Sequence, residues 1–459
     1  MILTRSKKTN TFLLNKYKKN EISYKILYNF TIGTYNASST ALLTDYDAVS
    51  RDRQGFAQFT LEDLENSLEF CTHVIYGYAG INPQSLQMTS LNTQRDIEER
   101  HFTEVTALKE KYPHIKFLLS LGGDKDIGLD LNNKYMELLE AGYDIQKSFI
   151  ESVLYLLRSY KFDGLDLAYQ FPRNNYYGKV IIDAPWKSLK KLFIKNLNET
   201  ETKVDDHKTQ FSLLVQNLRN ALKPHDLILS LTVLPNVNAS HYLNASALIP
   251  HLDFINLQTF DFTTPELSPN EATYTAALYS VPQQGTRNVL HSVDYQVNYW
   301  LAQRISHNKI NIGIAAYGRA WKMTTDSKTD GFPKVLATNG PASAGYITKL
   351  PGVLTWPEIC PMLPNMLNVN KSGPHAPLLN VLDPHKDFVT YAFRPADENG
   401  EYGMWVSYDD PRIVAIKAAY VKRRHLAGIA LYDVSLDDFH GLCNGDTFPM
   451  LRYIKYTFL

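Results

Sequence analysis

The sequence has few cysteines, no excess of charge of either sign and no long apolar run. Its 459 residues contain only Cys71, Cys360 and Cys443, too few for a disulfide framework and spaced unlike a zinc site. The 47 basic and 47 acidic residues cancel, so nucleic acid is a poor candidate partner. No run of about 18 apolar residues occurs, so we expect no membrane insertion. We also expect neither metal nor cofactor.

The amino terminus lacks a regular pattern. Residues 1–45 show no convincing periodicity, and the stretch from Met1 to Thr31 has no apolar segment followed by small residues, so no clear secretory signal is visible. We expect residues 1–45 to be a divergent or disordered segment.

From residue 46 onward, short apolar strands alternate with helices. The seven strands that can be read start near Thr72, Lys116, Phe162, Leu227, Phe254, Ile310 and Gly428. Such alternation predicts a parallel sheet, and right-handed crossovers let it close into a (β/α)8 TIM barrel. An eighth strand is required upstream of Thr72. An open doubly wound sheet is the alternative, but no glycine-rich phosphate loop follows the first readable strand.

Two local helix signals support this reading. Thr60 and Asp63 form a weak capping box at the start of a short helix. A longer helix is expected to start near Asp144, with one apolar face at helical spacing; that face consists of Ile145, Phe149, Val153, Leu156 and Leu157.

The alternation breaks between Trp321 and Tyr402, where Pro, Gly and Thr are frequent. We expect a small inserted α+β domain at 322–401, with the barrel formed by 46–321 and 402–459.

The stretch Phe162–Gln170 reads as a buried strand that carries acids. Asp163, Asp166 and Gln170 are expected to crowd its carboxyl end, which is the working face of such a barrel. The stretch resembles the D-G-x-D-x-D-x-E motif of the glycoside hydrolase family that contains most chitinases. Ala168 stands at the third acid, and Gln170 stands at the proton-donating glutamate.

Further pieces match that family in order. They are Thr72–Tyr76, Ser120–Gly123, Gln258–Asp261, Tyr317–Arg319, Trp405–Asp410 and Leu436–Phe439. The sequence from Phe162 to Pro172 resembles that of a narrower group, the imaginal disc growth factors. These are secreted insect chitinase-like proteins without enzymatic activity. The resemblance covers roughly Tyr46 to the carboxyl terminus.

The resemblance implies a substrate-assisted mechanism in which the glutamic acid protonates the glycosidic oxygen. Gln170 has no proton to give, and general acid catalysis is typically worth roughly a hundred- to ten-thousandfold in rate. Phe260 stands where the family has a tyrosine that bonds the reacting sugar, and Tyr432 replaces the tryptophan floor. We therefore expect no catalysis. The alternative is that Asp166 or Asp261 has taken over as the acid.

A protein that has lost catalytic activity can still bind a sugar. Seven residues are candidates to line a cleft: Tyr76, Asp163, Asp166, Gln170, Phe260, Asp261 and Tyr432. The alternative is that they are scaffold remnants, with Asp163 and Asp166 satisfying neighbouring backbone groups. Arg319, which follows Tyr317 and Gly318, is either a cleft residue or a structural ion-pair partner, and we favour the second role.

The resemblance also bears on the cysteines and on glycosylation. It pairs Cys360 with Cys443 and leaves Cys71 unpaired, because Thr44 stands where the partner of Cys71 belongs. Six Asn-x-Ser/Thr sequons occur, and only Asn238 matches the family; the others are Asn29, Asn36, Asn198, Asn244 and Asn370.

The function implied by the resemblance is that of an inactive chitinase-like protein outside the cell. It would promote growth, organise cuticle or matrix, and bind chitin or another N-acetylglucosamine-containing glycan or a cell-surface receptor. An active chitinase and a pure chitin-binding lectin are the alternatives.

Overall fold

The computed structural model describes residues 40–126, 133–172, 204–235, 237–280, 291–329, 335–382 and 389–459. Residues 1–39, most of the predicted amino-terminal segment, lie outside this part of the chain, as do the sequons at Asn29, Asn36 and Asn198. Within the described residues, no helix combines the length and the apolar character needed to cross a membrane.

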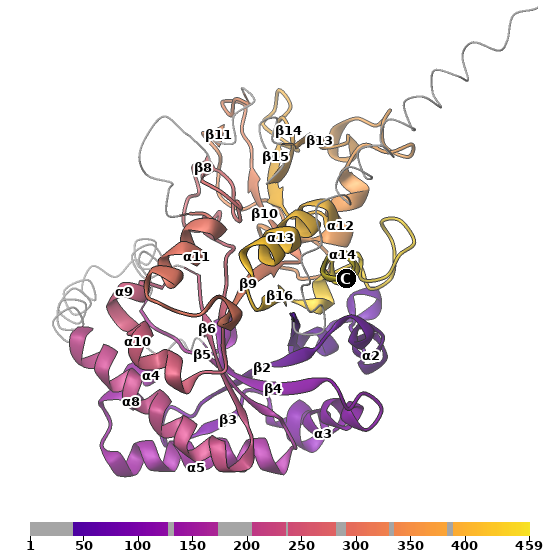
Figure 1. The fold of residues 1–459 in the computed structure, drawn as a ribbon. Coiled ribbons are helices and arrows are strands. Elements are labelled where there is room, and N and C mark those ends of the chain that lie inside the picture. Colours follow the sequence, from indigo (N-terminus) through magenta and orange to yellow (C-terminus); the bar gives the residue numbers. More distant parts are fainter. Residues whose placement is uncertain are drawn as a thin grey trace, which may run out of the picture. The chain divides into compact units, whose positions relative to one another are not determined.

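Eight parallel strands form a closed barrel (Figure 1). In spatial order they are β1 (Ala41–Asp47), β16 (Gly428–Tyr432), β9 (Ile310–Ala315), β7 (Phe254–Leu257), β6 (Ile228–Val233), β5 (Gly164–Ala168), β4 (Lys116–Gly122) and β2 (His73–Ile81). Pairing of β1 with β2 closes the ring. The predicted TIM barrel is confirmed, and the open doubly wound sheet is excluded.

The eighth strand that the sequence left unplaced is β1. It begins at Ala41, so the predicted barrel boundary at Tyr46 is wrong by five residues at this end. Leu42 and Leu43 are buried, and Asp45 and Asp47 follow them on either side of Tyr46 in this short strand. The two acids weaken the apolar pattern by which a strand is recognised in a sequence, so this strand could not be placed from the sequence.

Helices alternate with the strands along the chain. They are α2 (Leu61–Ser67), α3 (His101–Ala107), α4 (Lys134–Glu140), α5 (Tyr143–Ser159), α8 (Val204–Leu222), α9 (Ala239–Tyr242), α10 (Ala245–Leu248), α11 (Val293–Ala302), α13 (Pro411–Arg424) and α14 (Pro449–Phe458). Thr60 and Asp63 form the predicted capping box of α2. On α5, Phe149, Val153, Leu156 and Leu157 are buried, but Ile145 is 44% exposed, so its assignment to the apolar face is wrong. It lies in the first turn, beyond the packed surface.

A second, antiparallel sheet is inserted between barrel strands β9 and β16. Its strands, in spatial order, are β12 (Val353–Thr355), β10 (Tyr317–Lys322), β15 (Met404–Tyr408), β14 (Thr390–Arg394) and β13 (Leu379–Leu382). The short helix α12 (Trp356–Ile359) follows β12, and two small pairings complete the strands: β3 (Met88–Ser90) with β2, and β8 (Glu271–Ala272) with β11 (Val335–Leu336). β10 begins before the bounds expected for the insert, 322–401, and β15 lies wholly outside them; these bounds stay a prediction.

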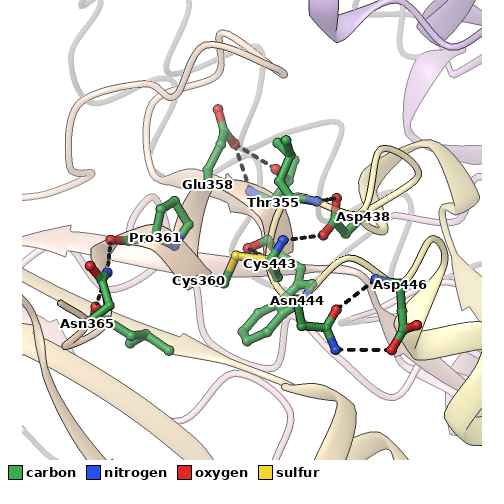
Figure 2. The surroundings of a disulfide bond; sticks show 12 residues. Thr355, Glu358, Cys360, Pro361, Asn365, Asp438, Cys443, Asn444 and Asp446 are labelled. Atoms are coloured by element: carbon green, nitrogen blue, oxygen red, sulfur yellow. Dashed lines mark hydrogen bonds between the residues drawn. A yellow bond between two sulfur atoms is a disulfide. The ribbon is translucent and has the colours of Figure 1, made fainter. Parts of the chain in front are cut away.

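The disulfide Cys360–Cys443 links the inserted segment to the chain after β16 (Figure 2). The two Cα atoms are 5.8 Å apart. The backbone N–H of Cys443 donates to Asp438 Oδ2 at 2.7 Å, which fixes the second half of the bridge. Cys71 is a buried free thiol. Both expectations about the cysteines are confirmed.

Candidate functional site

The barrel interior is apolar at one level and polar at the next. Because side chains alternate along a strand, every second residue points inward. Leu43, Ile75, Leu118 and Ala430 form one apolar layer with neighbours that include Phe260 and Tyr432. The inward faces of the strands also carry Ser120, Asp166, Ser230, Thr232, Asn256 and Asn311, all buried.

Asp166 is the hub of this polar layer. Its carboxylate accepts hydrogen bonds from the hydroxyls of Ser230 (2.6 Å), Ser120 (2.9 Å) and Thr232 (2.9 Å). The amide of Asn256 adds a fourth donor at 3.4 Å. Burial raises the pKa of Asp166, and these donors oppose the rise. With four donors fixing both oxygens, this carboxylate has little freedom to reach a substrate.

Ala168 and Gln170 lie at the carboxyl end of β5. Ala168 is the last residue of the strand, and both side chains are buried. Gly122, at the end of the neighbouring strand β4, has a φ of 106°, and a Cβ there would come within 2.3 Å of the Ala168 carbonyl oxygen. The two strand ends therefore pack closely, and the side chains present at positions 168 and 170 are a methyl group and an amide.

Asp261 is held by the second sheet. Arg319 of β10 pairs with it, with Nε 2.8 Å from Oδ1. The Tyr317 hydroxyl donates to Oδ2 at 2.8 Å. Asp261 adopts a φ of 54°, in the left-handed region, and is buried. Arg319 is thus a structural ion-pair partner, as its surroundings favoured.

Phe260 and Tyr432 pack against each other near the same end. Their ring centroids are 5.1 Å apart, and Tyr317 lies 6.1 Å from Phe260. Gly313 of β9 makes room for this group, because a Cβ there would meet the Phe260 ring at 3.0 Å. The structure therefore brings Phe260, Tyr432, Tyr317 and Asp261 together at the carboxyl end of the barrel, and Tyr432 also lies near Asp166.

Asp163 lies at the other end of the barrel, so its expected place beside Gln170 is wrong. It precedes β5, and its Oδ2 accepts from the backbone N–H of Phe117 at 2.8 Å. Lys109 also pairs with it, at 3.2 Å. This is the scaffold role considered as the alternative: the carboxylate fixes the start of two adjacent strands.

Tyr76 is also separate from the site. Its hydroxyl donates to Asp96 at 2.6 Å, and its ring lies 5.0 Å from Phe102 of α3. It points outward into the layer between strands and helices, because it is offset by one residue from the inward-facing Ile75. A cleft role for Tyr76 does not agree with this position.

Asp45 was not among the site residues predicted from the sequence. It lies on β1 with the inward-facing Leu43, is 4% exposed, and one carboxylate oxygen has no hydrogen-bond partner among the described residues. The other oxygen is 3.5 Å from the Tyr78 hydroxyl. Burial and the nearby carboxylates of Asp166 and Asp433 raise the pKa of Asp45 well above its usual value. Its spacing from Leu43 was the available signal.

The described residues contain no group of three or more His, Cys, Asp or Glu side chains placed to hold a metal ion. The site thus offers hydrogen-bonding groups and aromatic rings. In the described part, its acids are either tied to neighbours, as Asp166 and Asp261 are, or enclosed, as Asp45 is.

Comparison with known proteins gives consistent results. The model of the family "Glycosyl hydrolases family 18" matches residues 44–437. Chitinase-like protein Idgf3 of Drosophila simulans is 49% identical over 441 residues, which is 95% of this chain and 98% of that protein. Imaginal disk growth factor 6 of Drosophila melanogaster is 43% identical over 436 residues, covering 93% and 95%.

A solved chitinase structure has the same fold. It is a mutant of Group II chitinase catalytic domain 2 from Ostrinia furnacalis in complex with penta-N-acetylchitooctaose, (NAG)5. It superposes with a TM-score of 0.73 at 26% identity and covers 91% of this chain and 96% of that one.

Proposed function

Because the chain belongs to family 18 of the glycosyl hydrolases, we propose that it is a chitinase-like growth factor that acts outside the cell and does not hydrolyse chitin. The names of the relatives, chitinase-like protein and imaginal disk growth factor, support the growth-promoting role. Organisation of cuticle or matrix and binding of a cell-surface receptor are part of the proposal.

One observation carries the loss of catalysis: no carboxylic acid stands at position 170, and the neighbouring acids are engaged elsewhere. Asp166 accepts four hydrogen bonds inside the barrel. Asp261 is paired with Arg319 and Tyr317. A general acid must reach the leaving oxygen within hydrogen-bond distance. These contacts argue against the hypothesis that either residue has replaced the glutamate.

Retained glycan binding is the second part of the proposal. Phe260, Tyr317 and Tyr432 place aromatic rings beside polar groups, a combination that suits sugars. The Ostrinia furnacalis domain, which has the same fold, is described in complex with a chitin-type oligosaccharide. We propose that N-acetylglucosamine oligomers bind at the carboxyl end of the barrel, with Gln170 and Asp261 among the polar groups.

Three assays on one purified preparation separate the candidate functions. A fluorogenic chitobioside measures hydrolysis, chitin beads measure binding, and proliferation of cultured insect cells measures growth promotion. We expect no hydrolysis and a proliferative response. Binding to beads without proliferation would favour the lectin.

Asp45, the buried acid that was not predicted from the sequence, supplies a control together with Asp166. Hydrolysis by the parent protein that disappears in Asp45→Asn or Asp166→Asn would overturn the proposal and identify the acid responsible.

A further inference from the structure

The amino end of the barrel carries a concentration of positive charge that the balanced composition of the chain conceals. Two segments supply it: residues 303–309, which connect α11 to β9, and residues 422–427, which run from the last turn of α13 to β16. Together they contain five Lys or Arg side chains and two His, and no Asp or Glu. We call one surface the basic face; it consists of Arg304, His307, Lys422, Arg423, Arg424 and His425.

The two segments adjoin each other. His307 Nδ1 lies 2.8 Å from the carbonyl oxygen of Arg424, and the backbone N–H of Ala427 donates to the carbonyl of His307 at 3.1 Å. Arg424 Nη1 also lies 3.0 Å from Asp294 Oδ1 on α11, so α11 and α13 are side by side (Figure 1). Four members of the basic face are exposed: Arg304, His307, Arg423 and His425. The charge is therefore gathered on one accessible surface.

Much of this charge is not neutralised by nearby acids. Neither Arg304 nor Arg423 forms an ion pair with any described residue. Lys422 donates to the backbone carbonyls of Thr457 and Phe458, at 3.3 and 3.4 Å, and so keeps its positive charge. A helix dipole favours cations near the carboxyl terminus of the helix, which accounts for some of these side chains. It gives no reason for the absence of acids from both segments.

The basic face has no exposed apolar centre. Ile305 and Leu426, the large apolar residues of the two segments, are both buried. Stable protein–protein interfaces bury a central cluster of apolar and aromatic anchors, and segments that enter a lipid surface present apolar side chains. Neither kind of partner fits this surface. A hydrated polymer with many negative charges does fit, because it can bind through charge-assisted hydrogen bonds alone.

We propose that the basic face binds a sulfated polysaccharide of the extracellular matrix. Guanidinium groups form paired hydrogen bonds to oxyanions, and Arg304 and Arg423 present two such groups. A single exposed ion pair contributes little, so the ligand must carry several charges that reach both arginines and the neighbouring cations together. The choice of a polysaccharide over a nucleic acid rests on the proposed function outside the cell, whereas the preference for a polyanion does not.

This binding is independent of the candidate sugar site. Residues 303–309 and 422–427 precede β9 and β16, so the basic face lies at the amino end of the barrel. Phe260 and Tyr432 lie at the carboxyl end. A polymer held by the basic face therefore leaves the carboxyl end of the barrel open.

The test measures the affinity of the purified full-length protein for fluorescent heparin oligosaccharides, the sulfated probe, by fluorescence anisotropy. We expect Arg304→Gln combined with Arg423→Gln to weaken binding at least about tenfold, because both paired contacts to sulfate are lost. Lys147→Gln combined with Arg158→Gln is the matched control, which removes the same charge from exposed positions on α5 and keeps the affinity. Binding of the parent should weaken as salt rises from about 50 to about 200 mM, because bound counterions are released.

Hydrogen exchange locates the contact. Heparin should protect backbone amides in residues 303–309 and 422–427 and leave α5 unchanged, since α5 leads into β5, which lies opposite β16 in the ring of strands. Protection confined to other parts of the chain would overturn the proposal.

Three results of the titration would also overturn it. They are no heparin binding at about 50 mM salt, where screening is weak, an equal loss of affinity in the control variant, and binding of duplex DNA or phosphatidylserine vesicles as tight as that of heparin. None of these measurements depends on chitobioside hydrolysis or on cell proliferation. Failure of heparin binding therefore leaves the proposed function standing, and failure of the proposed function leaves heparin binding measurable.

Discussion

Arg319 and Asp261 form a buried ion pair between the inserted sheet and the loop after β7, with Nε of Arg319 2.8 Å from Oδ1 of Asp261. The side chains are 17% and 10% exposed. The pair therefore fixes the second sheet against the carboxyl end of the barrel, where the aromatic rings Phe260 and Tyr317 also meet. In this chain the pair serves to hold two sheets together.

Replacing Arg319 by Met should destabilise the protein strongly, because it leaves the Asp261 carboxylate buried without its cation. Removing one partner of a buried pair costs about 3 kcal/mol or more. Urea unfolding followed by circular dichroism measures the loss. The double variant Arg319→Met with Asp261→Asn should recover part of it, since no unpaired charge remains. Equal stability of parent and single variant would mean that the pair does not hold the sheets.

Restoring the two acids should not restore an efficient enzyme. The residues Phe260 and Tyr432, which we predict to stand in place of a tyrosine and a tryptophan of the family, remain unchanged in the variant with the two acids. Ala168→Asp with Gln170→Glu is expected to show little hydrolysis of a fluorogenic chitobioside. Adding Phe260→Tyr and Tyr432→Trp provides the comparison. Activity of the double variant matching an active chitinase would show that only the acids were missing.

The folded protein should carry one disulfide and one thiol that reacts only after denaturation. Cys71 is buried, its Sγ donates to the Ser67 carbonyl at 3.4 Å, and burial raises its pKa to about 12. Alkylation followed by mass spectrometry, with and without urea, measures both states. Replacing Cys360 and Cys443 by Ser should lower the free energy of unfolding by roughly 2–4 kcal/mol, whereas Cys71→Ala leaves the bridge intact. Rapid labelling of native protein at Cys71 would contradict this.

Introducing a cysteine at Thr44 should create a second disulfide. Thr44 is buried and points to the outer side of β1, as Leu42 does, and Cys71 belongs to the same outer core as Leu42. The backbone of Thr72 bonds the Leu42 carbonyl at 2.8 Å, so the chain at Cys71 adjoins β1. We expect Thr44→Cys to bond to Cys71 and raise the melting temperature under oxidising conditions. A fragment in which Cys71 is bonded to Cys360 or Cys443 would contradict the arrangement.

Stability should fall as pH rises between about 4 and 7, partly because of Asp437. Burial raises the pKa of Asp437 to about 7 from 3.8 in the unfolded chain, against opposing backbone donors that include Met450. The folded state therefore binds the proton more tightly, and this contribution is greatest below the unfolded pKa and is lost as pH passes the folded value. One such group changes stability by up to about 1.4 kcal/mol per pH unit.

Comparison of urea unfolding across this range tests the assignment. Asp437→Asn should flatten the slope relative to the parent, and the exposed Asp144→Asn should not. An unchanged slope in Asp437→Asn would mean that Asp437 is ionised in the fold.

Local sequence patterns were sufficient to predict much of the architecture. The strands that begin near Lys116 and Gly428 were found from short apolar runs, because a strand buried on both faces needs nothing else. The capping box at Thr60 depends on residues only three apart, so sequence was sufficient for it as well. The first strand was not placed, since Asp45 and Asp47 interrupt its apolar character.

For the candidate site, too, some features follow from the sequence and others only from the tertiary structure. The prediction that Ala168 and Gln170 replace the acids of the motif rests on the sequence alone, because residue identity at a fixed spacing from Asp163 is read directly. Only the tertiary structure decided which side chains meet. Asp163 lies at the start of β5 and Tyr76 points outward, whereas Asp45, from a strand more than a hundred residues earlier in the chain, faces the same interior as Asp166. The reason is that inward direction and barrel level are set by register between strands, and register is a property of pairing over long separations rather than of any one segment.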